Sequence, residues 1–432
     1  MLFSRGYVVT NRERLYVTGA ACALAMAAAG AHAEDTIADA LTASKPILES
    51  SARLEHVQQQ GFADKAEALT WRNRLGFQSG DFHNVKLLVE FENITALTGD
   101  YNSTLNGKTG FPTVLDPEVT ELNRAQLVWT PTAETTFTFG RQRMILDDSR
   151  FIGNVGWRQD EQTMDAVRVD TTLFRVKLTA AYLGRINRVV ADAKDWQSNS
   201  YILNASYSFS EALKFTAFDY AFKFSSAATA PTLADIANAK ISSVSTTGLR
   251  AYGSDWVSAF KLGYVAQYAT EKNAGLNPAV FTLHETMLEG NATYDIYTFK
   301  VNYEALEGNG SVGFVTPLGT VHAFEGFADV FSATGGNKTF VNGIHDLNFG
   351  LTVAGHTKPW APYFLNPTLT VIYHDLKTDR LDTPIGKEWD AVLTAGITKN
   401  LSVMLKYADF ERADPTMPAS RTKTWIMLQY KL

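Results

Sequence analysis

Hydrophobic and polar residues alternate along most of this chain in short segments that are typical of β-strands. In one of them, Leu69, Trp71 and Leu75 fall on one face of an extended strand, and Arg72 and Arg74 fall on the other. About eighteen such segments can be placed from residue 48 to the end of the chain. No second run of about 18 apolar residues follows the N-terminal one, which excludes transmembrane helices but not membrane-spanning strands.

The connections between these segments alternate in length. Those after even-numbered segments are mostly very short, such as 79–81 and 171–172, whereas those after odd-numbered segments are longer, notably 144–161 and 307–342. Outer-membrane barrels have this asymmetry because their periplasmic turns are short and their extracellular loops are long. We therefore expect an all-β fold: a membrane-spanning, antiparallel, up-and-down β-barrel of about 18 strands, surrounded by outer-membrane lipid.

The N-terminus has the three parts of a secretory signal peptide. A basic region with three arginines precedes an apolar run, and Ala31-His32-Ala33 supplies a small-residue cleavage site. We expect a signal peptide over 1–33, a periplasmic N-terminal segment over 34–47 and the barrel over 48–432. The amphipathic last strand resembles the signal that barrel-assembly machinery reads, although it ends in Leu432 and not in the usual Phe. The predicted location is the outer membrane of a Gram-negative type of cell.

Cysteine content and charge exclude several functions. Cys22, the single cysteine, lies in the apolar run of the signal, so the mature chain is expected to form no disulfide and no Cys/His metal site. The formal net charge of −6 over 432 residues does not suggest a nucleic-acid partner.

Catalysis has little support in the sequence. Ser149 stands beside acidic residues but lacks a nearby His and the G-x-S-x-G context of a nucleophile. Asp147 and Asp148 could bind calcium through hard oxygen ligands, but pairing with the arginines of 141–150 is the favoured alternative. We predict that the protein is not an enzyme, and we expect no catalytic residue, metal or cofactor.

The charged face of each strand must point into the lumen, because a cation near the bilayer midplane costs about 2–4 kcal/mol. Arginine suits carboxylated ligands, because its planar guanidinium binds a carboxylate with two hydrogen bonds and stays charged. The alternative is that these cations pair with lumen carboxylates and only brace the barrel. By alternation, the candidate lumen arginines are Arg72, Arg74, Arg124, Arg168 and Arg175.

A barrel of eighteen strands encloses a lumen too wide for side chains alone to fill. A selective channel of this size needs a further constriction. We expect the long loops 144–161 and 307–342 to fold inward and supply it.

Two blocks of sequence resemble the signature of the alginate-export family of outer-membrane porins. The first has Gly-Arg-Gln at 140–142, Asp-Ser-Arg-Phe-Ile-Gly at 148–153 and Asp-Ala-Val-Arg at 165–168, and the second covers 322–331 and 343–347. The resemblance implies a monomeric, eighteen-stranded barrel with an electropositive pore for an anionic exopolysaccharide. It implies pore roles for Arg74, Arg124, Arg141, Arg150 and Arg168, with Asp165 as a bracing anion. Alternation points Arg141 outward unless a bulge intervenes.

The leading hypothesis is therefore a channel for an anionic polysaccharide or its oligomers. The alternative is a general or small-solute porin for organic or aromatic acids, in which the recurring motifs serve only the barrel. The expected partners are an anionic polysaccharide or a small anionic solute, outer-membrane lipid and barrel-assembly machinery. A third class, an outer-membrane enzyme, requires a convergent His, Ser and Asp site, and the scattered His residues argue against it.

Overall fold

The structure is a computed structural model that describes residues 36–331, 340–355 and 364–432. The predicted signal peptide over 1–33 and part of the predicted loop 307–342 lie outside the described residues. Within the described ranges, no helix is long and apolar enough to cross a membrane.

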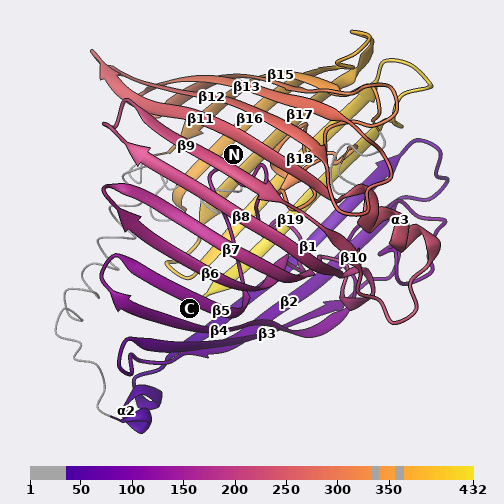
Figure 1. Ribbon diagram of the computed structural model, residues 1–432. Helices are drawn as coiled ribbons and strands as arrows, with labels where there is room; N and C mark the ends of the chain where they lie inside the picture. Colours follow the sequence, from indigo (N-terminus) through magenta and orange to yellow (C-terminus); the bar gives the residue numbers. More distant parts are fainter. Residues whose placement is uncertain (1–35, 332–339, 356–363) are drawn as a thin grey trace.

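Antiparallel strands make up most of the described chain (Figure 1). They are β1 (Lys45–Gln59), β2 (Ala66–Gln78), β3 (Val85–Ala96), β4 (Val119–Thr132), β5 (Thr135–Gln142), β6 (Thr163–Leu173), β7 (Val176–Asn187), β8 (Trp196–Ser208), β9 (Lys214–Ala221), β10 (Phe224–Ser226), β11 (Val244–Val257), β12 (Phe260–Asn273), β13 (Thr282–Tyr294), β14 (Tyr297–Leu306), β15 (Ile344–Ala354), β16 (Leu365–Lys377), β17 (Pro384–Gly396), β18 (Leu401–Arg412) and β19 (Arg421–Lys431).

These strands form one closed barrel of eighteen. The short β10 continues β9, because Ala221 pairs with Tyr201 and Phe224 pairs with Ser198 in the same register on β8. Pairing of β1 with β19 closes the sheet into a ring. The predicted fold class is confirmed.

Among the described residues, the helices α2 (Ile37–Thr42) and α3 (Leu233–Ile241) and the 3-10 turn η1 (Asp192–Lys194) lie at the ends of the barrel. The 3-10 turn η2 (Val321–Ala323) belongs to connection 307–343, and its first two residues are buried. In Figure 1, α2 lies below the wall of strands, and the amide of Gly80 in the β2–β3 turn donates to the carbonyl of Ala40 (2.8 Å). Strand β1 begins at Lys45, three residues before the predicted start of the barrel.

Alternation assigns a face to each strand residue as predicted. Trp71 and Leu75 are 45% and 56% exposed on the outer face, whereas Arg72 and Arg74 on the same strand are buried. On the last strand, Ile426 and its neighbours two positions away are likewise exposed. An exposed apolar outer surface is what a lipid-facing barrel wall requires.

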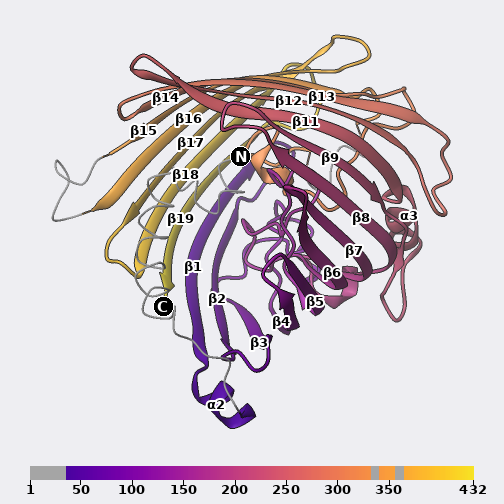
Figure 2. The ribbon, with the colours of Figure 1, turned by 60° about the vertical axis from the view of Figure 1, so that its left-hand side comes forward.

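The apolar core lies inside the ring of strands, where two long connections fold. These connections are 143–162, between β5 and β6, and 307–343, between β14 and β15. Figure 2 shows irregular segments within the ring. The first cluster joins Phe151 and Ile152 of one connection to Phe314 and Leu318 of the other. The second packs Trp157, Phe327 and Phe331 against wall residues that include Met404, Ala408 and Trp425.

Candidate functional site: the lumen constriction

The two inward loops contact each other across the lumen. The amide of Gly153 donates to the carbonyl of Leu318 (2.8 Å), and the amide of Thr320 donates to the carbonyl of Ser149 (2.9 Å). Ile152 and Leu318 also form an isolated parallel bridge. The prediction that loops 144–161 and 307–342 fold inward is confirmed for their described residues.

Buried ion pairs fix loop 143–162 to the wall at β1. Arg53 on β1 donates to the carbonyl of Trp157 and to Asp116. Arg158 of the loop contacts Glu55 on β1 (3.3 Å) and Asp329 of the second loop (3.0 Å). These charges are almost fully buried, so removal of one partner leaves an uncompensated charge.

The second loop is fixed to the wall at β17, three strands from β1 around the ring. The amides of Phe327 and Ala328 donate to Asp390 (2.9 Å) and Glu388 (2.6 Å) on β17. Gly326 has a φ of +92°, and a Cβ there would collide with the Glu388 carboxylate. Glycine is therefore the residue that permits this close approach.

Arg72 and Arg74 are buried in an ion-pair network and are not open to a passing solute. Arg72 contacts Glu49, and Arg74 contacts Glu92 through its Nε. Arg74 Nη2 also lies 3.5 Å from Glu161 of the first loop. These two arginines therefore hold the loop to β2 and β3, which is the bracing alternative.

Arg150 joins both loops to the wall. Its Nε donates to Glu304 on β14 (2.6 Å), its Nη2 donates to Glu325 of the second loop, and its guanidinium lies 4.6 Å from the centre of the Phe324 ring. The side chain is 1% exposed. Arg150 lies in the predicted constriction, but as a buried brace.

Three of the predicted arginines, Arg124, Arg141 and Arg168, are partly exposed. Arg124 is 16% exposed and binds Glu90 on β3 (2.6 Å). Arg168 is 21% exposed and binds Asp170 (2.7 Å). Arg143, which the sequence suggested only as a loop ion pair, is 29% exposed and contacts Glu161. Partial exposure leaves these cations able to meet a solute.

Arg141 and Asp165 form an ion pair between β5 and β6, with Nε 2.8 Å from Oδ1. Arg141 also donates to the carbonyl of Leu122 (2.9 Å), and Asn187 donates to Asp165 (3.0 Å). The preceding Gly140 has a φ of +103°, a backbone that disturbs regular strand geometry. This ion pair is consistent with the predicted bracing role of Asp165. A role of Arg141 in the pore stays a prediction.

Arg175 lies outside the lumen site, so its predicted place in a strand is wrong. Phe174 and Arg175 form the turn between β6 and β7, with φ values of 50° and 70°. The Arg175 guanidinium is exposed and lies 5.6 Å from the centre of the Tyr207 ring. Alternation assigns no face within this two-residue turn, because its residues do not have extended backbone.

Asp147 and Asp148, at the start of the first loop, bind side chains of the barrel wall. Asp148 accepts from Arg250 on β11 (2.5 Å), and Asp147 accepts from Asn204 on β8 (2.8 Å). Burial opposes ionisation of Asp148, but Arg250 outweighs it and holds the pKa of Asp148 below its ordinary value. Ion pairing, the predicted alternative to calcium, is therefore observed for Asp148, but its partner is Arg250 and not an arginine of 141–150.

Comparisons with known proteins find similar folds but no similar sequence. No protein-family model and no curated protein matches it. Among solved structures it is similar to Pseudomonas aeruginosa OpdK, solved with vanillate (14% identity, 90% of this chain and 98% of that chain, TM-score 0.66). It is similar to Acinetobacter baumannii OccAB4 (11% identity, 91% and 99%, TM-score 0.67) and to Pseudomonas aeruginosa OccK2 (13% identity, 91% and 98%, TM-score 0.66).

These similarities show the closed, antiparallel β-barrel fold, and they do not show the alginate-export family. They extend over nearly the whole of each chain, so the complete barrel is shared. At this level of identity only the fold follows.

Proposed function

We propose that this protein is an outer-membrane channel for small solutes that carry carboxylate groups. The observation that carries the proposal is the set of partly exposed arginines, Arg124, Arg143 and Arg168, in a lumen narrowed by two loops. Each of these arginines is paired with one carboxylate, and a partly exposed guanidinium in a narrow, low-dielectric passage still attracts a solute of opposite charge.

The pairing of these arginines suits transient binding. The Nε and Nη2 groups of Arg124 donate to Glu90. Arg168 donates through Nη2 to Asp170 (2.7 Å), and among the described residues neither arginine donates through Nη1, which can therefore donate to a carboxylate. A channel needs sites attractive enough for solute to enter and weak enough for it to leave.

A small solute is favoured over a polymer by the path of the loops. Loops 143–162 and 307–343 bond to each other. Loop 143–162 also bonds to β1 through Arg158 and to β11 through Asp148, and these two strands lie on opposite sides of the ring, so the loops divide the lumen. The similar structure of OpdK was solved with vanillate, which is an aromatic carboxylate. The alginate-export hypothesis, a monomeric state and insertion by barrel-assembly machinery stay predictions.

Solute uptake into proteoliposomes tests the proposal. Vanillate and benzoate are compared with an uncharged solute of similar size and with oligomers of a uronic acid. We expect the aromatic carboxylates to pass fastest, R124A/R168A to slow them, and R175A, at an exposed turn, to behave as the unmodified protein. Equal rates for charged and uncharged solutes would contradict the proposal, and faster passage of the oligomers would favour the polymer hypothesis.

A further inference from the structure

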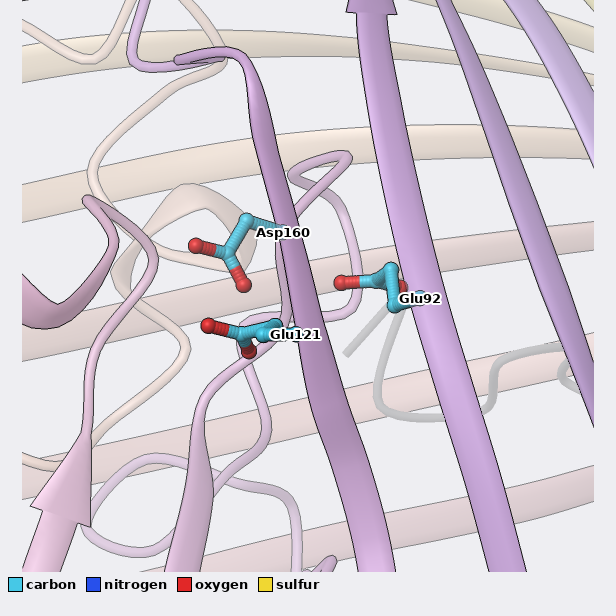
Figure 3. A group of neighbouring side chains, drawn as sticks. All are labelled: Glu92, Glu121 and Asp160. Carbon is cyan, nitrogen blue, oxygen red and sulfur yellow. The ribbon is translucent and has the colours of Figure 1, made fainter.

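Three carboxylates from three separate segments meet beside the first loop. Glu92 lies on β3, Glu121 on β4 and Asp160 on loop 143–162, and one oxygen from each lies within 4.8 Å of the others. Figure 3 shows their carboxyl groups pointing toward one another. Glu92 and Asp160 are 1% and 0% exposed, whereas Glu121 is partly exposed.

Two of these carboxylates each keep a buried oxygen without a hydrogen-bond partner. Asp160 Oδ2 accepts from the amide of Ala191 (3.2 Å), and Glu92 Oε2 accepts from Arg74. Among the described residues, Asp160 Oδ1 and Glu92 Oε1 have no such partner. A buried polar atom left unpaired costs about 1–3 kcal/mol, so these oxygens are suited to a ligand that the protein itself does not supply.

The charges around the group leave room for a further cation. Arg74 is bound to Glu92, and Arg72 lies 4.0 Å from Glu92. Both arginines lie on the Glu92 side of the group. Among the described residues, neither Glu121 nor Asp160 forms an ion pair with a lysine or an arginine, so these two carboxylates have no bonded cation.

We propose that Glu92, Glu121 and Asp160 bind a calcium ion that ties the first loop to the barrel wall. Carboxylate oxygens are hard ligands, which suit this class of cation. Calcium–oxygen distances of about 2.3–2.6 Å allow two ligand oxygens to lie up to about 4.6–5.2 Å apart, which covers the observed spread. Magnesium, at about 2.0–2.1 Å, would require the three groups to move closer together.

The ion would act on the position of the loop and on the charge of the lumen. Glu161, next to Asp160, already contacts Arg143 and Asn123, so a bound ion would add a second fixed point to the same segment. It would also cancel the negative charge of the partly exposed Glu121. Calcium is therefore expected to raise the preference of the channel for anions. The sequence predicted no metal, because these three residues are scattered between positions 92 and 160.

Titration of the purified full-length protein with calcium chloride by isothermal calorimetry tests the proposal. We expect saturable binding of one calcium ion per chain, weaker binding of magnesium, and a loss of calcium affinity of more than about tenfold in E121Q. E121Q is the first variant because Glu121 is partly exposed and its replacement leaves the buried pairs intact. E289Q on β13, which removes a lumen carboxylate paired with Lys300, is the matched control and should bind as the unmodified protein.

D160N provides a second measurement from the loop side. A shift of the folded band on unheated gels shows that each variant has formed its barrel. Absence of saturable calcium binding in the folded, unmodified protein would overturn the proposal, as would equal affinities in the unmodified protein, E121Q and D160N. Tighter magnesium than calcium binding would overturn the assignment to calcium. Binding is measured without transported solute, so its failure is separate from failure of the proposed channel function.

Discussion

Arg150 Nε lies 2.6 Å from Glu304 Oε1, a contact between a loop and a strand that are 154 residues apart in the chain. Both side chains are almost fully buried. The same guanidinium contacts Glu325, so one arginine joins the two lumen loops to β14. The constriction is thus held in place by paired charges inside the barrel and not by apolar packing alone.

Replacement of Arg150 by alanine should release the loops without dissolving the barrel. Glu304 and Glu325 would remain buried without their cation, and loss of one partner from a buried ion pair costs about 3–5 kcal/mol. We expect faster proteolysis within 143–162 and 307–343, and noisier single-channel currents. R175A is the matched control. Unchanged proteolysis of both loops in R150A would show that the ion pairs do not hold them.

Acid should leave the first loop docked down to about pH 5. Burial opposes ionisation of Glu161, but Arg74 and Arg143 outweigh it and hold its pKa well below the ordinary value of 4.5. A depressed carboxyl pKa gives stability that is fully present above the unfolded value and is lost only as the pH falls through the folded value.

We therefore expect proteolysis of 143–162 to stay constant between pH 7 and about pH 5 and to accelerate only in stronger acid. In E161Q the loop should be cleaved faster already at neutral pH. Release of the loop between pH 7 and pH 5 in the unmodified protein would contradict the assigned direction of the pKa shift.

Alanine at position 140 should destabilise the barrel near Arg141. Gly140 has a φ of +103°, and a Cβ there would collide with the carbonyl oxygen of Ala125. A strained backbone of this kind costs about 1–3 kcal/mol. Gly290 on β13 is the matched control, because a Cβ there would meet nothing within 4 Å. Heat denaturation followed on unheated and heated gels should show a lower midpoint for G140A than for G290A. Equal denaturation midpoints for G140A and G290A would contradict the prediction that alanine strains the backbone at position 140.

The barrel could be predicted from the sequence because alternation is a local signal. Trp71 and Arg72 lie on opposite faces of any strand that contains both. The contrast between short turns and long loops distinguishes the periplasmic end of the barrel from the extracellular end. Arg175 shows the limit of this signal, because alternation assigns no face within a turn.

The site was harder to predict because its contacts are distant in sequence. Arg74 and Arg124 have similar sequence patterns, yet one is buried against a loop and the other is partly exposed. The difference depends on where loop 143–162 lies, and no local pattern gives that position. For the same reason, the sequence did not predict that Glu92 and Asp160 lie close together, because Asp160 belongs to this loop.

The central claim is that partly exposed lumen arginines make this channel select anions. Reversal potentials of the purified protein in planar bilayers, measured across a potassium chloride gradient, test it most directly. We predict anion selectivity in the unmodified protein, a marked loss of it in R124A/R168A, and no change in R175A. Cation selectivity in the unmodified protein, or unchanged anion selectivity in R124A/R168A, would contradict the claim.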